Sequence, residues 1–233
     1  MKYEIFADEP AVATAAAKLI AAEARAAVAA RGRFLMAVSG GKTPWVMLKD
    51  LAIEDLPWAN VHIFQVDERL APDGDPDRNL THLHASLLGH APIPTENIHP
   101  MPVTAADPAQ GARDYEETLV RWSGQPPMLD LIHLGLGADG HTASLVPDDP
   151  VLGCHERDVA LTGVYQNKRR MTLTFPIINR SRRILWLATG AGKIPMVTRL
   201  LALDPTIPAG RVSQDHAILF TDKDAAPGPL SPG

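Results

Sequence analysis

The sequence has very little cysteine: Cys154 is the only one among 233 residues. A single cysteine excludes an internal disulfide framework and favours a reducing compartment, the cytoplasm. No apolar run approaches the roughly 20 residues of a membrane-spanning helix. The start, MKYEIFADEP, also lacks the basic segment followed by an apolar one that a signal peptide needs. We therefore expect a cytoplasmic protein without membrane association.

Positive charge is not in excess either. The chain has 22 lysines and arginines against 27 acidic residues, a net charge of −5, which gives no reason to expect nucleic acid or an acidic membrane as a partner. No metal-ligand spacing stands out, since His82 and His84 lie two apart on a predicted helix and do not share a face. We expect no metal, and any site for an anionic ligand must be local.

Apolar segments that alternate with helical patterns make up most of the chain. Because the candidate strands are near-continuous apolar runs, they indicate a mostly parallel sheet covered by helices on both faces. We predict one α/β domain over residues 1–223 and a disordered, Pro- and Gly-rich tail over 224–233. The predicted strands are 3–6, 33–39, 61–68, 129–137, 169–175, 182–190 and 216–222. The predicted helices are 10–30, 79–89, 108–122 and 191–203, with one more starting at Thr43-Pro44, where the Thr43 hydroxyl is the N-cap.

Four polar or glycine-rich segments follow predicted strands. They read SGGKTP (39–44), DERLAP (67–72), GADGH (137–141) and TGAGK (189–193). In open parallel sheets, ligands bind at the carboxyl ends of the strands. The repeated placement of such segments at strand ends predicts that they form one site.

The segment SGGKTP opens a helix directly after a strand. Backbone N–H groups at Gly40 and Gly41 can close on an anion there, and the helix N-terminus adds partial positive charge. It is not a Walker A loop, because that motif needs glycine at position 36, where Met36 stands. We predict a small phosphate site with Ser39, Gly40, Gly41 and Thr43; the alternative is a tight turn that binds nothing.

Cationic side chains accompany the other segments. Arg69 is a candidate bidentate phosphate ligand if the Gly40-Gly41 turn lies beside it, and the alternative is a solvated charged loop. Lys193 lies in the first turn of a predicted helix, where the helix dipole disfavours a cation, so its position indicates a nearby anion. Of the pair Arg169-Arg170, only one side chain can face a given side of the strand.

Residues 135–141, GLGADGH, spell the G-x-G-x-x-G of a dinucleotide-binding turn. Such a turn opens a long helix, whereas Pro147 and Pro150 interrupt this chain within two turns. Asp139 and His141, two residues apart in an extended turn, can instead face a ligand from the same side. Histidine suits a general base near neutral pH. The alternative is that His141 only caps the next short helix.

Taken together and in order, five segments resemble the 6-phosphogluconolactonase family of the glucosamine-6-phosphate isomerase/6-phosphogluconolactonase superfamily. They are SGGKTP, VDER with Asn79 shortly after it, LGLGADGHTASLVP, RRMTLTFPIIN and TGAGK, and the resemblance runs from about residue 3 to 222. It implies a three-layer α/β sandwich with a Rossmann-like sheet, related to glucosamine-6-phosphate deaminase. The implied activity is hydrolysis of 6-phospho-D-glucono-1,5-lactone to 6-phospho-D-gluconate in the oxidative pentose phosphate pathway, without a cofactor or a metal.

The resemblance also implies site residues. His141 takes the place of the catalytic base, and we expect Asp139 to orient either the imidazole or the attacking water. Arg69 and Lys193 match phosphate ligands, and Arg170 is a further basic residue facing the substrate. The full binding set that we expect is Ser39, Gly40, Gly41, Thr43, Asp67, Arg69, Asn79, Arg170 and Lys193.

Two departures from family patterns bear on the function. The deaminases follow the D-G-H sequence with Phe-Asn-Glu-Pro, whose glutamate supports the histidine, whereas here the run is TASLVP with Leu145 and no acid before Pro147. This disfavours a deaminase. Arg78-Asn79 stands where the lactonases have Ser-Asn, which leaves the role of Arg78 open. A deaminase, a non-catalytic sugar-phosphate binder and a dinucleotide oxidoreductase remain as alternatives, and the oligomeric state stays open.

Overall fold

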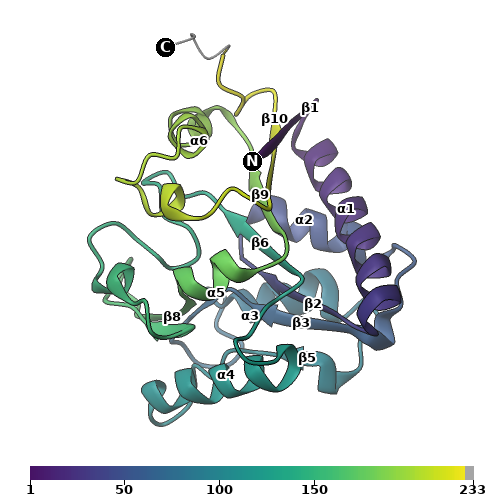
Figure 1. Cartoon of the computed structure of the whole chain (residues 1–233), viewed down its shortest axis with the longest axis vertical. Coiled ribbons are helices and arrows are strands. Elements are labelled where there is room, and N and C mark those ends of the chain that lie inside the picture. Colours follow the sequence, from purple (N-terminus) through teal and green to yellow (C-terminus); the bar gives the residue numbers. More distant parts are fainter. Residues whose placement is uncertain (229–233) are drawn as a thin grey trace.

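The computed structural model describes residues 1–228 and is built on a seven-stranded sheet with the order β1-β10-β9-β6-β2-β3-β5 (Figure 1). Every neighbouring pair in this sheet is parallel. The strands are β1 (Lys2–Phe6), β2 (Phe34–Val38), β3 (Val61–Gln65), β5 (Ile98–His99), β6 (Leu131–Gly135), β9 (Ile184–Ala188) and β10 (Ala217–Asp222). The predicted parallel α/β sheet is confirmed.

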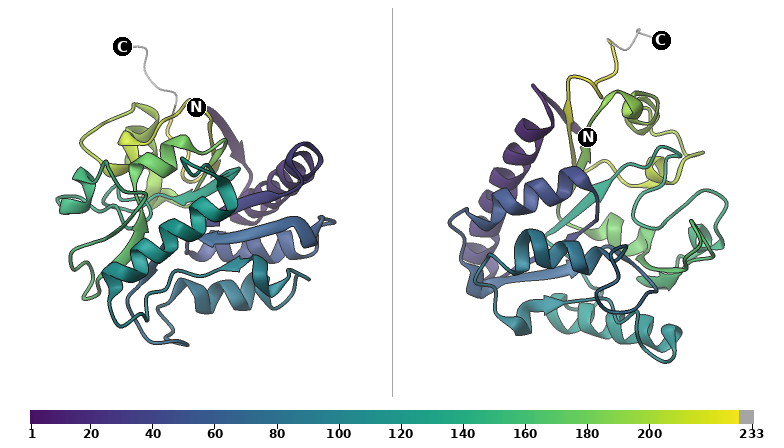
Figure 2. Two further views of the ribbon diagram at one scale, coloured as in Figure 1. Left: turned by 60° about the horizontal axis from the view of Figure 1, so that its bottom comes forward. Right: turned by 180° about the vertical axis from the view of Figure 1, so that it is seen from behind.

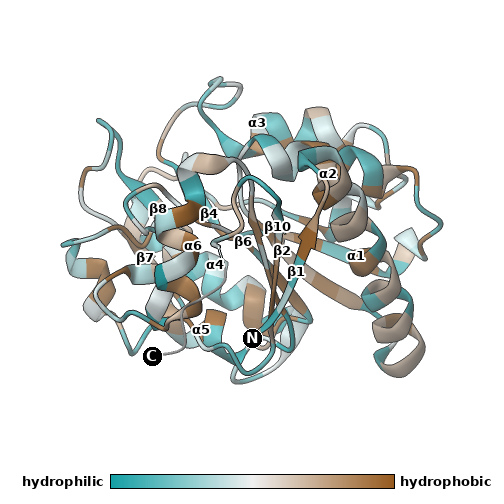
Figure 3. Ribbon diagram, turned by 90° about the horizontal axis from the view of Figure 1, so that it is seen from above, coloured by the Kyte–Doolittle hydropathy of each residue, from teal (hydrophilic) through white to brown (hydrophobic). Residues whose placement is uncertain are grey.

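Helices cover both faces of the sheet, giving three layers (Figure 3). Alternate side chains of a strand point to opposite faces, so Met36 packs in the core under α1 and α2, while Leu35 packs with α4. The helices α1 and α4 lie on opposite sides of the sheet in all views (Figure 2). The helices are α1 (Glu9–Arg31), α2 (Lys42–Ala52), α3 (Asn79–Leu83), α4 (Pro108–Ser123), α5 (Phe175–Arg180) and α6 (Ile194–Leu201).

Short helical turns connect these elements. The predicted helix at 79–89 is α3 followed by a π-helical turn, His84–Leu88, and the predicted helix at 191–203 is the 3-10 turn Ala191–Lys193 followed by α6. The other 3-10 turns are Trp58–Asn60, Thr95–Asn97, Pro150–Gly153 and Pro208–Arg211. Within residues 1–228 no helix combines the length and the apolar character needed to cross a membrane.

The long helix α1 follows from its local sequence. The Asp8 side chain caps it by accepting a hydrogen bond from the Ala11 N–H (2.9 Å), and Pro10 occupies the first turn, where no N–H is needed. Its buried stripe is mostly alanine, with Val12 and Ile20, which lets the helix lie close against α2 and the sheet. The predicted helix over 10–30 is therefore confirmed.

A second, three-stranded antiparallel sheet corrects two strand predictions. It has the order β4 (Asp67–Arg69), β8 (Arg170–Leu173), β7 (Val159–Leu161). The predicted strand 61–68 is broken at Val66, whose N–H donates to Val38 in the main sheet (3.0 Å) and whose carbonyl accepts from Leu173 (2.8 Å). The predicted strand 169–175 joins this small sheet and not the parallel one. An apolar run reads the same in either sheet, so the pattern cannot distinguish them.

The start of α2 corrects a cap prediction. Gly41, at φ 135°, is the N-cap residue, and the helix begins at Lys42. The Thr43 hydroxyl makes no cap; it donates to Glu9 Oε1 (2.8 Å) and shares a hydrogen bond with Thr189. Glu9 belongs to α1 and lies 34 residues before Thr43, so the sequence around Thr43 does not indicate this partner.

The chain end extends beyond the predicted domain boundary. Ala225 is buried, and its N–H donates to Asp222 Oδ1 (2.8 Å). Part of the segment 224–233 that we expect to be disordered is thus packed on the fold, and residues 229–233 lie outside the described residues.

The centre of the sheet is a topological switch point. The chain leaves β2 toward the face covered by α1 and α2, and it leaves the neighbouring β6 toward the opposite face, where α5 packs. Loops that diverge in this way leave a crevice at the carboxyl ends of the two strands, where open α/β sheets bind their ligands.

Candidate active site

A pocket of about 290 Å³ opens at this switch point. Its lining residues come from the ends of β2 and β6, from β4, from the start of α3, from β8 and from the turn before α6. They are Ser39, Gly40, Gly41, Asp67, Arg69, Asn79, Gly135, Leu136, Gly137, Ala138, His141, Ala143, Arg170 and Lys193. The pocket thus brings together every site residue expected from the sequence except Asp139 and Thr43.

His141 and Asp139 form a hydrogen-bonded pair at the pocket. His141 Nδ1 lies 2.5 Å from Asp139 Oδ1, which also accepts from the His141 backbone N–H (3.1 Å). An ionised carboxylate can only accept hydrogen bonds, so Nδ1 carries the proton of the neutral imidazole and Nε2 is left able to accept one. Asp139 thus contacts the imidazole directly through Oδ1.

The backbone of the turn forces this pairing. The Gly137 N–H donates to the His141 carbonyl (2.8 Å), which folds the turn back on itself. A Cβ on Gly137 would lie 2.7 Å from Asp139 Oδ1 and closer still to the His141 ring, so only glycine leaves room for the pair. No helix starts at His141, and the next helical turn is Pro150–Gly153, which excludes both the dinucleotide turn and the capping role.

The Asp139 carboxylate is held in its charged form. Partial burial acts to raise its pKa, but hydrogen bonds from the His141 backbone and ring, the His141 charge and the Tyr165 hydroxyl together place the pKa below its ordinary value. The Tyr165 hydroxyl donates to Asp139 Oδ2 (3.0 Å). Both carboxylate oxygens are therefore engaged, one with the histidine and one with the tyrosine.

Arg69 lies beside the Gly40-Gly41 turn, as the phosphate interpretation requires. It donates from its guanidinium to Asn79 Oδ1, and the Asn79 amide donates in turn to the Asp67 carbonyl (2.9 Å). A Cβ on Gly40 would lie 2.9 Å from Asn79 Cγ. Asn79 thus touches both the turn and the arginine, and it sets the distance between them.

Arg170 and Lys193 supply two further cations. Arg170 is buried; it donates to Gln166 Oε1 (3.0 Å) and weakly to Ser144 (3.5 Å), and its Nε has no partner among the described residues. Lys193 Nζ donates to the Leu136 carbonyl (2.5 Å). Burial lowers the pKa of Lys193, although the negative charge of Asp139 acts to raise it. Burial and the positive charge of Arg69 together lower the pKa of Arg170. Burial removes water from both cations, which costs free energy unless a negative charge lies nearby. The two side chains therefore indicate an anionic ligand.

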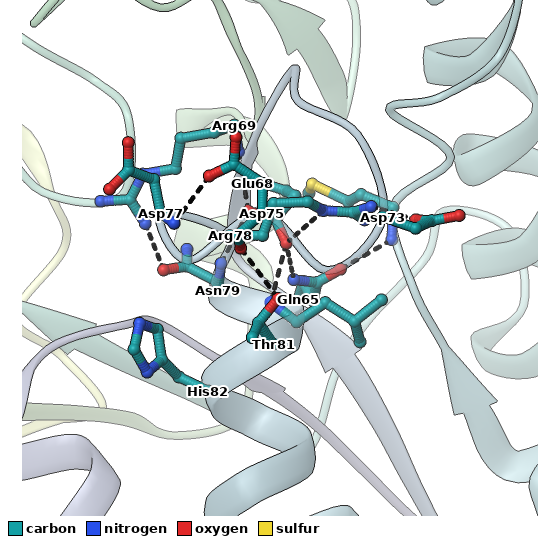
Figure 4. A network of polar contacts seen from close by, with 12 residues as sticks. Gln65, Glu68, Arg69, Asp73, Asp75, Asp77, Arg78, Asn79, Thr81 and His82 are labelled. Carbon is teal, nitrogen blue, oxygen red and sulfur yellow. Dashed lines mark hydrogen bonds and ion pairs between the residues drawn. The ribbon is translucent and has the colours of Figure 1, made fainter.

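A buried glutamate that the sequence interpretation missed organises the loop behind Arg69 (Figure 4). Glu68 is fully buried, and its carboxylate accepts from the backbone N–H groups of Arg69, Asn79 and Leu80, each at 2.8 Å. Arg78, itself 2% exposed, pairs with Glu68 (Nε to Oε2, 3.5 Å) and with Asp73. Arg78 therefore pairs with buried and loop carboxylates and does not line the pocket.

Other expected residues have internal partners. The Ser39 hydroxyl donates to the His133 carbonyl (3.0 Å), and Asp67 Oδ2 accepts from the Ser144 hydroxyl (2.6 Å). Thr43 lies outside this pocket lining, with its hydroxyl on Glu9. Tyr165, Gln166 and Ser144 complete the surroundings of the expected residues and were not expected. The Tyr165–Asp139 and Ser144–Arg170 contacts each span 26 residues and carry no local signal in the sequence, whereas Gln166 is only four residues from its partner Arg170.

The pocket is positively charged in an acidic protein. Arg69, Arg170 and Lys193 face it with Asp67 as the one lining acid, and such a local field concentrates an anionic ligand. Among residues 1–228 no group of three or more His, Cys, Asp or Glu side chains is arranged to hold a metal ion. Fold and pocket define an α/β protein that can hold a small anion beside a candidate general base.

The chain belongs to the glucosamine-6-phosphate isomerase/6-phosphogluconolactonase family, whose model matches residues 7–220. It is similar to the 6-phosphogluconolactonase of Mycobacterium tuberculosis, with 36% identity over 237 residues that cover 96% of each chain. Among solved structures, 6-phosphogluconolactonase from Thermotoga maritima matches with a TM-score of 0.85 and 27% identity, covering 95% of this chain and 99% of that one. The family expected from the sequence is confirmed.

The fold is shared more widely than the activity. A monomeric glucosamine-6-phosphate deaminase matches with a TM-score of 0.83 at 19% identity, covering 97% of this chain and 98% of its own. This likeness confirms the expected fold relationship. Because the same fold serves two different reactions, the choice between them depends on the site.

Proposed function

We propose that this protein hydrolyses 6-phospho-D-glucono-1,5-lactone to 6-phospho-D-gluconate in the oxidative pentose phosphate pathway. The observation that carries the proposal is one pocket that holds the Asp139–His141 pair together with three cations. Relatives over nearly the full length of the chain are named for this reaction. We further propose that the protein acts in the cytoplasm and has no nucleic-acid partner, on the basis of its single cysteine and net negative charge.

The phosphate of the substrate binds to the cationic part of the pocket. Arg69 and Lys193 neutralise it, the backbone of Gly40 and Gly41 lies against it, and Arg170 adds a third cation, whose buried Nε has no hydrogen-bond partner among residues 1–228. Thr43 acts indirectly, by tying the α2 start to Glu9. Anchoring the phosphate places the lactone carbonyl carbon, C1, near His141 and lowers the entropic cost of reaction.

His141 acts as the general base and then as the general acid. Its Nε2 takes a proton from water as the water oxygen bonds to C1, and the carbonyl becomes an oxyanion. The oxyanion then collapses, the bond between C1 and the ring oxygen breaks, and the imidazolium returns its proton to that oxygen. The products are the C1 carboxylic acid, which ionises in water, and the C5 hydroxyl. Asp139 stabilises the imidazolium, and such a base contributes about 10²–10⁴-fold.

The alternative, deamination of glucosamine 6-phosphate, is less well supported. In the deaminase run Phe-Asn-Glu-Pro the glutamate directly precedes the proline, and the residue directly before Pro147 in this chain is Val146, an apolar side chain that is buried. An unpaired carboxylate at that buried position would be strongly disfavoured in its charged form. Asp139 and His141 belong to the D-G-H run that deaminases also carry, so the missing glutamate is what distinguishes this chain from them.

One experiment tests the proposal directly. The lactone is generated in the cuvette by oxidation of glucose 6-phosphate, and its disappearance is compared with the spontaneous rate, with and without the protein. We expect the protein to accelerate the loss and His141→Ala to abolish the acceleration. A parallel assay measures ammonia from glucosamine 6-phosphate. Ammonia release without lactone hydrolysis would overturn the proposal in favour of a deaminase.

A further inference from the structure

Tyr165 is held at the tip of a hairpin beside the pocket. Its backbone N–H donates to the Lys168 carbonyl (3.0 Å) and its carbonyl accepts from the Lys168 N–H (3.2 Å). The two residues between them, Gln166 and Asn167, have φ values of 50° and 64°, as in the two-residue type I′ turns that match the twist of a hairpin. The tip therefore presents the Tyr165 side chain in a defined direction.

That side chain contacts both parts of the proposed catalytic machinery. Its hydroxyl donates to Asp139 Oδ2 (3.0 Å), and its ring lies edge-on to the His141 ring, with 5.6 Å between centroids and 65° between planes. The guanidinium carbon of Arg170 lies 5.0 Å from the centroid of the same ring. Tyr165 is thus the contact between the acid–base pair and one of the cations.

The two ends of the side chain act on different groups. The hydroxyl holds the second oxygen of Asp139, and with Oδ1 on His141 Nδ1 the carboxylate can no longer rotate freely. The ring provides a π-face for Arg170, which is buried. Among residues 1–228 the Arg170 guanidinium makes one hydrogen bond to Gln166 (3.0 Å) and a weak one to Ser144 (3.5 Å). A cation over an aromatic face is stabilised by the ring quadrupole, more so when it is desolvated.

We propose that Tyr165 is a positioning residue with two separable parts: its hydroxyl aligns Asp139 and His141 for proton transfer, and its ring holds Arg170 in place for the phosphate. This inference rests on the proposed function. Nothing in the surrounding sequence, GVYQNKRR, marks the tyrosine for this role. The contact arises because the hairpin between β7 and β8 folds over the turn that follows β6.

Two substitutions separate the parts. Tyr165→Phe removes only the hydroxyl, and we expect kcat to fall about 5-fold with KM changed less than about 2-fold, the effect of one lost hydrogen bond to a charged group acting through Asp139. Tyr165→Leu removes the ring as well, and we expect the same fall in kcat together with a rise in KM of about 5-fold. Val164→Ala is the matched control, because Val164 is the neighbouring side chain in the hairpin and is 71% exposed; it leaves both constants unchanged.

A spectroscopic measurement tests the hydroxyl without relying on turnover. Long-range ¹H–¹⁵N spectra of the His141 imidazole at alkaline pH report which ring nitrogen carries the proton. We expect the Nδ1–H form to dominate in the wild-type protein and the Nε2–H population to rise in Tyr165→Phe. A tyrosine with only a structural role would lower the melting temperature without changing this ratio or kcat.

The outcomes separate this inference from the proposed function. Unchanged kcat and an unchanged imidazole spectrum in Tyr165→Phe would overturn the role of the hydroxyl, and an unchanged KM in Tyr165→Leu would overturn that of the ring. If the wild-type protein did not hydrolyse the lactone, the proposed function would fail, yet the spectrum of Tyr165→Phe would still decide whether the hydroxyl aligns the pair.

Discussion

Asn79 lies directly against Gly40: a Cβ at Gly40 would lie 2.9 Å from Asn79 Cγ and nearer still to its Oδ1, the atom that accepts from Arg69. We therefore expect Gly40→Ala to displace Asn79 and with it the Arg69 guanidinium. KM for the lactone should rise about 10-fold, the effect of one weakened charged hydrogen bond, while the fold persists. Steady-state kinetics measure this. Gly153→Ala is the control, since its Cβ would meet nothing within 4 Å, and equal KM values in the two variants would contradict the prediction.

Replacing Asp139 by asparagine should reduce kcat far more than it changes KM. The amide keeps the shape of the side chain but removes the charge that stabilises the imidazolium, and it can donate to Nδ1 and so favour the wrong tautomer. We expect kcat to fall by about 10²–10⁴-fold, the range for general acid–base groups. Near-full kcat in Asp139→Asn would remove Asp139 from the mechanism.

The buried Glu68 should be a determinant of stability. In Glu68→Gln one carboxylate oxygen becomes an NH₂ group, which cannot accept the hydrogen bonds that Asn79, Leu80 and Gln65 now donate to Glu68. Arg78 would also lose its negatively charged partner. Removing one partner of a buried ion pair costs about 3–5 kcal/mol, so the free energy of unfolding should drop by about that amount. Urea denaturation measures it. The exposed Glu96, changed to Gln, serves as the control and should cost almost nothing.

Three buried histidines should make the protein less stable in acid. Burial lowers the pKa of His133 to about 3, and burial with a nearby positive charge lowers those of His62 and His99 to about 4, from 6.5. Each folded-state pKa lies below the unfolded one, so between about pH 4 and pH 6.5 the unfolded chain binds more protons and stability falls as the pH is lowered. Well above pH 6.5 these groups are neutral in both states and add nothing to the pH dependence of stability.

Proton uptake on unfolding provides the measurement for this prediction. Near pH 5 the three histidines should together take up about three protons when the chain unfolds. His62 Nδ1 and His99 Nε2 share a hydrogen bond of 3.1 Å, and His62→Gln should remove about one proton from the total. A slope of unfolding free energy against pH that is identical in the wild type and His62→Gln would contradict the assignment.

Much of the architecture was readable from local patterns. The helix α1 follows from Asp8, Pro10 and a buried alanine stripe, and the parallel sheet follows from apolar strands that alternate with helices. The polar segments SGGK, DER, GADGH and TGAGK converge because carboxyl ends of parallel strands share one edge, which sheet geometry enforces whatever the side chains. The pairing of Asp139 with His141 is similarly local, since a glycine-rich turn joins two residues only two apart.

Long-range contacts decided the rest. The run 61–68 is divided between two sheets because Val66 bonds to β2 on one side and to Leu173 on the other, and no periodicity within the run records those partners. Thr43 leaves its helix end for Glu9, Arg78 is buried against Glu68, and Tyr165 reaches Asp139 from 26 residues away. Sequence alone determined which residues are candidates for the proposed chemistry, because residue type and local turns set charge and basicity. The tertiary structure decided which of them are held in place and by what, because hydrogen bonds and ion pairs form between groups that only folding brings within reach.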